Sequence, residues 1–388
     1  MTSKQQIAEA ILRLHSHIKK THWNGEAVVG PDPGIRFNAR VGRFVKGYLN
    51  FMPWSDNLVY SQAQKYWIAS NWLMHDLGCG DIKSCKAMAI ACSDYLLKVQ
   101  RPEGYWEYPN PEWRGRIATV EGNYATIGML ETFARTFHAP LLEGAKKWYE
   151  YAVNEIGFQK DGEFIAINYF GNYGTAMVPN NSASIVRVFA MLAEQARDDR
   201  YLEICVPMVN WLNTVQLDSG ELPYAVRPPG EKHKSDRIHF LCHQYNAFEF
   251  LNLADYFDLT QDQTILPVLR KLSRYLVTGV TDSGACRYTC EKEFPEVAYY
   301  TTALGAALRR ATVMGFGDYQ KLADRAYGRL LSQQKTDGNM QFYSRKNYGF
   351  LTDKRSYARY LCMILFHFLS ELKLHAKGIE KFSEIQKG

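Results

Sequence analysis

The feature that most constrains the fold of this chain is a glycine turn that recurs about every 58 residues. Its glycines are Gly104, Gly162, Gly220, Gly284 and Gly338, at intervals of 58, 58, 64 and 54 residues. Three copies read "LLKVQRPEGYWEYP", "WLNTVQLDSGELPYAV" and "LLSQQKTDGNMQFYS". Because self-similarity at such a period is typical of repeat architectures, we expect one supersecondary unit to be repeated along most of the chain.

Two kinds of helix are predicted in each repeat. Before the glycines lie amphipathic stretches such as "SCKAMAIACSDYLLKVQ", with apolar residues at i, i+3, i+4 and i+7. Between them lie stretches such as "VAYYTTALGAALRRA", whose centres are apolar on almost every face, as in helices that are buried on most sides. The glycine supplies the positive φ that ends the amphipathic helix. Each unit is therefore an inner helix, a turn, an outer helix and a glycine turn with a short extended segment.

The number of repeats predicts a ring. Six inner helices pair with six outer helices if an N-terminal helix at about residues 4–20 is counted, which predicts an all-α fold, a closed (α/α)6 toroid. An open solenoid is the alternative. We expect a single domain, 1–388, with an insert at about 30–59 covering one end. Helices in hairpins run antiparallel, so the inner helices should be mutually parallel and their N-termini should share one end, the mouth.

The turns also carry a family resemblance. "VQRPEGYWEYP" and "QQKTDGNMQFYS" resemble the QW-type repeats of terpenoid cyclases and protein prenyltransferases. A Gln–Gly turn after an outer helix is similarly found in α/α toroids that act on sugars, among them uronic-acid epimerases, lyases and glycosidases. The resemblance implies the toroid architecture for most of the chain, with either isoprenoid or carbohydrate chemistry at the mouth.

Polar residues gather at the start of every inner helix and become rare further along it. Helix capping explains Asn and Ser at such positions, such as Asn180, Ser182 and Ser356. Capping does not require Gln, Tyr, His or Arg, which are costly in a narrow funnel unless something polar binds there. Six converging helix N-termini also suit an anionic group. The mouth is therefore the predicted functional site.

The resemblance to toroid uronate lyases and epimerases implies roles at this mouth. Asn123 or Asn181, together with Arg359, would neutralise the substrate carboxylate, while His243 and Tyr300 would act as base and acid. His243 is also the strongest acid–base candidate from its ordinary pKa. A hydrogen-bonded structural role is the alternative for His243.

Two glutamates offer a different chemistry, because Glu121 and Glu296 could act as the carboxyl pair of a glycosidase. Their alternatives are caps or ion pairs, and Arg359 could form a structural salt bridge with Glu296 or Asp353. The remaining substrate-binding candidates are polar mouth residues and aromatic side chains on which a sugar could stack: Gln62, Tyr245, Asn246, Tyr299, Tyr357, Trp54 from the insert and Trp106 from a glycine turn.

Composition excludes several classes. The net charge of +6 is dispersed and forms no basic stripe, which argues against nucleic acid. The sequence has no long apolar run of a membrane span, and its start lacks the apolar core of a signal peptide. The 8 Cys form no obvious disulfide framework, so we expect a reduced, cytoplasmic protein.

Motif searches narrow the chemistry further. The DxDD and DDxxD strings of terpenoid cyclases are absent, as are a P-loop, a GxSxG elbow and HExxH. Cys242 and His243 could join Cys286 and Cys290 in a zinc site, but CxxxC is not the usual CxxC clip. We therefore predict neither a metal nor a cofactor.

Three functions remain. The favoured one is an enzyme acting on an acidic sugar or glycan, as a lyase, epimerase or glycosidase, with a small-molecule or oligosaccharide substrate. The alternatives are an isoprenoid-processing enzyme and a noncatalytic binding protein. An isoprenoid site should be apolar below the mouth, whereas a sugar site should keep polar groups at depth.

Overall fold

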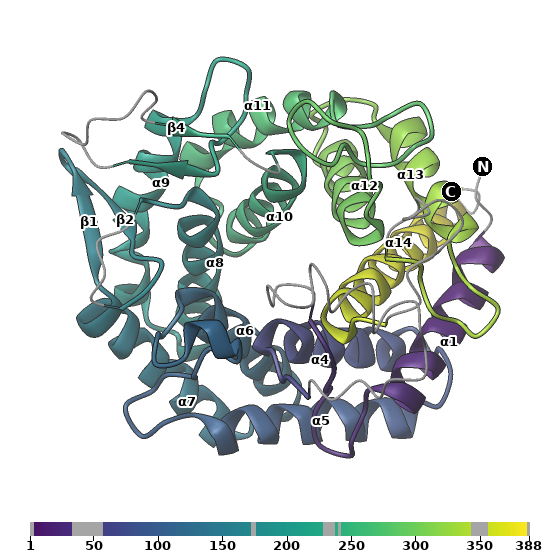
Figure 1. The fold of residues 1–388 in the computed structure, drawn as a ribbon, viewed down its shortest axis with the longest axis horizontal. Helices are drawn as coiled ribbons and strands as arrows, with labels where there is room; N and C mark the ends of the chain where they lie inside the picture. The colour runs from purple at the N-terminus through teal and green to yellow at the C-terminus, as the bar shows by residue number, and fades with distance from the viewer. Residues whose placement is uncertain are drawn as a thin grey trace.

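The helices form a ring of hairpins in the computed structural model, which describes residues 4–32, 57–171, 176–227, 237–239, 242–342 and 356–385 (Figure 1). The inner helices are α4 (Ser61–Asp76), α6 (Thr119–Thr136), α8 (Pro179–Ala196), α10 (Cys242–Thr260), α12 (Ala298–Val313) and α14 (Ala358–Ile385). The outer helices are α5 (Ile82–Val99), α7 (Ala139–Tyr151), α9 (Cys205–Val215), α11 (Leu266–Val277), α13 (Gln320–Ser332) and α1 (Lys4–Thr21).

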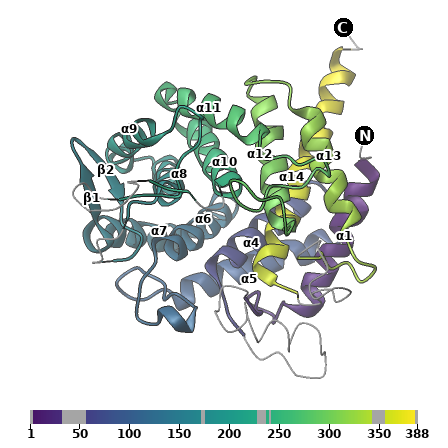
Figure 2. The same cartoon turned by 45° about the horizontal axis from the view of Figure 1, so that its top comes forward.

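Contacts between neighbouring inner helices close the ring. Each packs against the next along the chain, and α14 contacts both α12 and α4. The first helix, α1, packs on α14 and α13 and completes the outer layer, as Figure 2 shows from a tilted direction. The closed (α/α)6 toroid is therefore confirmed, and the open solenoid is not formed.

The repeated glycines explain how neighbouring hairpins approach one another. All five have positive φ, from 63° at Gly162 to 107° at Gly104. At four of them a Cβ would clash with a backbone carbonyl of the next outer helix: Gly104 with Lys147, Gly220 with Lys271, Gly284 with Arg325 and Gly338 with Arg13. The last of these contacts lies between the C-terminal repeat and α1, so it helps to close the ring.

A glutamine four residues before three of these glycines completes the turn. Each side-chain amide donates to the carbonyl of its own glycine and to a carbonyl in the next outer helix: Gln100 to Gly104 and Gly144, Gln216 to Gly220 and Val268, and Gln334 to Gly338 and Ala10. The Gln–Gly pattern thus joins adjacent outer helices, and its role is architectural.

The extended segments after the glycine turns are short. Strands β1 (Phe158–Asp161) and β2 (Phe164–Ile167) form an antiparallel hairpin around Gly162, where a Cβ would meet no neighbour. Strands β3 (Ala225–Val226) and β4 (Arg237–Ile238) form a second antiparallel pair. Short turns of 3-10 helix at Pro111–Trp113, Asp199–Leu202 and Gln263–Ile265, and a π-helical turn at Ala152–Ile156, complete the connections.

The described part of the predicted insert is confined to its ends. Gly30 and Leu58 pair in an antiparallel bridge, which brings the two ends of the insert together. The central part of the predicted insert, with Trp54, lies outside the described residues, and the expected cover over one end of the ring stays a prediction. None of the described helices has the length and apolar character needed to cross a bilayer.

Candidate functional site

A cavity of about 200 Å³ lies at the mouth of the toroid. All six inner helices contribute to its wall, with further side chains from the loops before α6, α8 and α10. The lining residues are Gln62, Tyr108, Val120, Glu121, Tyr124, Tyr169, Val178, Asn180, Asn181, Tyr224, Gln244, Tyr245, Phe248, Tyr299, Arg359, Tyr360 and Met363. The predicted convergence of the helix heads is therefore present, and it encloses a space.

Glu121 has the most useful acid–base properties in this cavity. It stands in the first turn of α6, its side chain is buried, and its Oε2 accepts a hydrogen bond of 2.8 Å from the backbone N–H of Ser61. Burial raises the pKa of Glu121 to about 7, although the hydrogen bonds from Ser61 and the charge of Arg359 oppose the shift. A carboxyl with this pKa can both take up and give up a proton at neutral pH.

Arg359 supplies positive charge at the same mouth. Its Nε lies 2.8 Å from Oδ2 of Asp32, and its Nη2 lies 3.0 Å from Oδ1, which makes a two-point ion pair with a buried carboxylate. The guanidinium also stacks over the rings of Tyr60 and Tyr360, at 4.4 and 4.7 Å from the centroids. The ion pair and the rings hold Arg359 in place against the cavity.

Two buried amides in the wall have unused hydrogen-bonding groups. Asn181 is 2% exposed and Gln244 is 4% exposed. Nδ2 of Asn181 has no partner, and neither does Oε1 of Gln244, whose Nε2 is 3.4 Å from the hydroxyl of Tyr299. Buried polar atoms are nearly always satisfied in proteins, so one unpaired donor and one unpaired acceptor indicate a polar ligand or water in this space.

Tyrosines make up much of the remaining wall. Tyr299 stacks on Tyr360 with 4.0 Å between ring centroids, and Tyr224 meets Tyr245 edge to face at 4.9 Å. Burial raises the pKa of Tyr224, Tyr245 and Tyr299, so their phenols stay protonated at neutral pH. Such rings offer both a flat apolar face and a hydroxyl group that can donate to a sugar oxygen.

A second cavity, of about 490 Å³, lies at the opposite ends of the inner helices. Phe248 lines both cavities. Most of the charged side chains of the second cavity form ion pairs with one another, including Arg187 with Asp255 and Arg309 with Glu371. The mouth is the better candidate site because it combines Arg359 with the raised pKa of Glu121 and with two unpaired buried amide groups.

Six residues predicted from the sequence lie together in the wall of the mouth cavity. One is the catalytic candidate Glu121, and the others are the binding candidates Gln62, Asn181, Tyr245, Tyr299 and Arg359. The salt bridge considered for Arg359 also exists, but its partner is Asp32 rather than Glu296. Asp353, the other partner considered, lies outside the described residues.

His243 and Tyr300 do not line the cavity. The His243 ring stacks on Tyr275 of the outer helix α11 at 4.8 Å, and its Nε2 is 3.1 Å from Oγ1 of Thr278. Burial and the charge of Arg287 lower the pKa of His243 to about 4, so it is neutral at pH 7. Tyr300 stacks against Tyr288, behind Tyr299. These contacts agree with the alternative interpretation of His243, a hydrogen-bonded structural role.

Three further candidates hold the hairpins together. Glu296 accepts hydrogen bonds from Ser283, Gln333 and Arg329, with which it forms an ion pair. Asn123 donates to Ser184 and accepts from the indole of Trp148. Asn246 bonds both backbone groups of Leu222, at 2.8 and 2.9 Å, and so fixes the extended segment that follows Gly220.

The last three candidates are aromatic. Tyr357 is buried edge to face against Phe342, at 4.8 Å. Trp106 is also buried and its indole N–H donates to the carbonyl of Leu96, so it packs under its loop and does not present a stacking surface. Trp54 lies outside the described residues, and its assignment stays a prediction.

Four polar residues at the mouth were not predicted: Tyr108, Tyr169, Tyr224 and Asp32, which is the ion-pair partner of Arg359. A periodic signal existed for two of them, because Tyr108 and Tyr224 both stand four residues after a repeated glycine. The same position carries Tyr288 and Phe342 in the later repeats. Asp32 lies at the edge of the insert, where no repeat pattern could indicate its partner.

The cysteines also differ from expectation in one respect. Cys242, the first residue of α10, is joined to Cys290 in a disulfide, with 5.2 Å between the Cα atoms. The other six are free: Cys79, Cys85, Cys92, Cys205, Cys286 and Cys362. The pair has no counterpart in the repeat pattern, so the cysteine spacing gives no indication of it.

Together, the fold and the site define a class: a closed (α/α)6 toroid with an enclosed polar cavity where the inner helices begin. Similar solved structures include a polysaccharide lyase, with TM-score 0.66, 10% identity and coverage of 97% of this chain and 99% of that chain. A possible GH105-family member from Salmonella enterica serovar Paratyphi A gives 0.69 and 11%, covering 97% and 96%. A cellobiose 2-epimerase from Bacillus thermoamylovorans gives 0.71 and 11%, covering 95% and 100%.

At these identities the similarity establishes the fold alone. No family model matches the sequence, and comparison with curated proteins gives no significant match. By their descriptions the three structures are a polysaccharide lyase, a possible GH105-family member and a cellobiose 2-epimerase, and they give no support to the terpenoid cyclase resemblance.

Proposed function

We propose that this protein is a carbohydrate-active enzyme that transfers a proton to or from an acidic sugar bound in the mouth cavity. The observation that carries the proposal is that Glu121, whose pKa is raised to about 7, and the partly buried cation Arg359 line the same polar cavity. The descriptions of the similar structures, a lyase, a GH105-type protein and an epimerase, support a sugar or glycan substrate.

The polar atoms at depth favour a sugar over an isoprenoid. Unpaired groups on Asn181 and Gln244 can receive a substrate hydroxyl, which both accepts and donates hydrogen bonds. An isoprenoid would leave both groups buried and unsatisfied, at a cost of about 1–3 kcal/mol each. The tyrosine wall can then stack on the apolar face of the sugar ring.

The number of carboxyl groups favours proton transfer over two-carboxyl hydrolysis. Among the described residues that line the cavity, Glu121 is the only carboxylic acid, whereas most glycosidases use two. In a lyase or epimerase that acts on a uronate, a cation neutralises the substrate carboxylate and a base removes the neighbouring proton. Here Arg359 would face the carboxylate, Glu121 would be the base, and a neutral tyrosine such as Tyr245 would return or supply a proton.

Incubation with uronic-acid oligosaccharides in D₂O tests this proposal directly. Proton removal next to the carboxylate either washes deuterium into the sugar, seen by NMR and mass spectrometry, or eliminates the glycosidic bond to give an ultraviolet-absorbing unsaturated product. Glu121→Gln should abolish both, while the exposed Glu163→Gln in the β1–β2 turn should be unaffected. Binding of uronates without any exchange or cleavage would contradict catalysis and favour a binding protein.

The Cys242–Cys290 disulfide departs from the fully reduced chain that the sequence predicts. The cytoplasmic location and the single-domain organisation stay predictions, as does the acidic nature of the sugar.

A further inference from the structure

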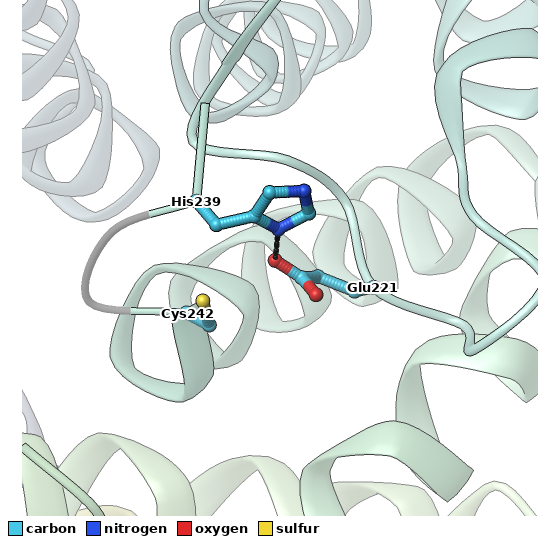
Figure 3. A group of neighbouring side chains, drawn as sticks. All are labelled: Glu221, His239 and Cys242. Carbon is cyan, nitrogen blue, oxygen red and sulfur yellow. Dashed lines mark hydrogen bonds and ion pairs between the residues drawn. The ribbon is translucent and has the colours of Figure 1, made fainter. Parts of the chain in front are cut away.

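A cluster of metal-binding side chains lies beside the mouth, outside the proposed sugar site. Glu221, His239 and Cys242 each offer one ligand atom, and these atoms all lie within 4.8 Å of one another (Figure 3). The sulfur of Cys290 is bonded to that of Cys242, so it belongs to the same cluster. Three potential ligands, of types S, N and O, therefore lie together, and the disulfide places the sulfur of Cys290 next to one of them.

The local structure fixes three of these ligands. Glu221 directly follows Gly220, and its neighbour Leu222 is held by both hydrogen bonds from Asn246 of α10. The Nδ1 atom of His239 lies 2.8 Å from Oε1 of Glu221, as the dashed line in Figure 3 shows. Cys242 is the first residue of α10, where the positive end of the helix favours a thiolate.

We propose that, when Cys242 and Cys290 are reduced, these four residues bind one zinc ion. Two thiolates, an imidazole and a carboxylate match the donors that zinc prefers, and four protein ligands without an open position are typical of a structural site. Glu221 is further oriented by a hydrogen bond from the phenol of Tyr275, in the manner of partners that position metal ligands.

The cluster can either bind zinc or hold the disulfide, and the two forms exclude each other. In the disulfide each sulfur uses its bonding capacity on the other and cannot act as a thiolate ligand. A phosphine reductant in water converts the disulfide to two thiols and is itself oxidised to the phosphine oxide. On zinc binding each thiol releases its proton to solvent. The ion then replaces the covalent link between the start of α10 and the segment around Cys290, and it adds His239 and Glu221 to that link.

The site would stiffen the rim of the mouth. It joins three segments that are far apart in the sequence: the turn at Glu221, the residue after β4, and the segment around Cys290 between α11 and α12. Gln244 and Tyr245, which line the sugar cavity, follow Cys242 within three residues. The inference uses none of the residues assigned to catalysis and does not depend on the proposed function.

Metal binding to the reduced full-length chain tests the site. Protein treated with phosphine reductant and then desalted should bind about one zinc per chain by mass spectrometry of metals, and the same protein left oxidised should bind none. Cobalt(II) should give a sulfur-to-cobalt charge-transfer absorption and the visible bands of a tetrahedral ion. Cys290→Ser and His239→Ala should each weaken zinc binding at least tenfold, while Cys79→Ser, at a free cysteine elsewhere, should not.

Two kinds of result would overturn the inference. If the reduced wild type binds no more zinc than Cys290→Ser, the pair is a structural disulfide only. If cobalt binds without a sulfur charge-transfer band, or if His239→Ala binds as the wild type does, the ion lies elsewhere. Circular dichroism of the metal-free variants controls for misfolding, and a rise in melting temperature on adding zinc, seen for the reduced wild type alone, gives a second readout.

Discussion

The buried carboxyl of Glu121 should make the stability of this protein depend on pH in an unusual direction. Glu121 is 2% exposed, and its pKa is raised from 4.5 to about 7. In the unfolded chain the pKa returns to its ordinary value. A difference of this size corresponds to about 3 kcal/mol between the two protonation states.

The sign follows from which state holds the proton more tightly. The folded protein binds the proton of Glu121 more strongly than the unfolded chain does, so this group contributes its stability fully below the unfolded pKa of 4.5. The contribution is lost as the pH rises toward the folded pKa of about 7. Replacement by Gln removes the ionisable group and keeps an oxygen that can accept from Ser61. The stability of Glu121→Gln relative to the wild type should therefore increase by about 3 kcal/mol between pH 4 and pH 8.

Urea unfolding followed by tryptophan fluorescence, at intervals across this pH range, measures the effect. Most of the gain, about 2 kcal/mol, should be present already at pH 6. The exposed variant Glu163→Gln serves as the control and should show a difference from the wild type that does not change with pH. A constant difference for Glu121→Gln would refute the reasoning, because it would mean that the carboxyl is not destabilised by burial and is not suited to proton transfer near neutrality.

Other residues give equally direct tests. Gly338→Ala should destabilise the protein by about 2–4 kcal/mol in urea unfolding, since φ is positive there and the added Cβ meets the Arg13 carbonyl; an unchanged midpoint would contradict the closing contact. Arg359→Lys should lower affinity for uronates at least tenfold in calorimetry but leave neutral sugars nearly unaffected, because Lys cannot form the planar two-point contact; equal losses would indicate a structural role. His243→Ala should keep most of the activity per folded molecule in the D₂O assay while lowering the melting temperature, since its ring packs on Tyr275; complete inactivation with normal stability would restore it as a catalytic residue.

The architecture could be predicted because the same local features recur along the sequence. Each repeated glycine has positive φ and follows a predicted amphipathic helix, and three of the five are preceded by a glutamine that bonds across to the next outer helix. Ring closure was an inference from the number of repeats. The contact between Gly338 and Arg13 shows why that number matters, because the last turn packs on the first helix as the turns at Gly104, Gly220 and Gly284 pack on the outer helix that follows each of them.

The candidate site was predicted only in part, because polar residues at the start of an inner helix can either line the cavity or bond a neighbouring segment. Asn246 and Asn181 are both amides in the first turns of inner helices, and nothing in the sequence around them tells them apart. Asn246 faces outward to the preceding turn and bonds Leu222, whereas Asn181 faces the cavity and keeps a free donor. The difference is the rotation of the residue about the helix axis relative to the ring, which depends on packing and not on local pattern.

Packing also decides which acid–base candidate can exchange a proton near neutral pH. His243 has the ordinary pKa nearest neutrality, yet burial lowers its pKa to about 4, so the ring is neutral at pH 7. The ring also packs on Tyr275 and does not line the cavity. Glu121 has an ordinary pKa far from neutrality, yet burial in the wall raises it to about 7. Burial shifts acids and bases in opposite directions, so the carboxylic acid becomes the group able to exchange a proton at pH 7. In an enclosed site, unperturbed pKa values therefore favour a histidine, whereas the pKa values shifted by burial favour a carboxylic acid such as Glu121.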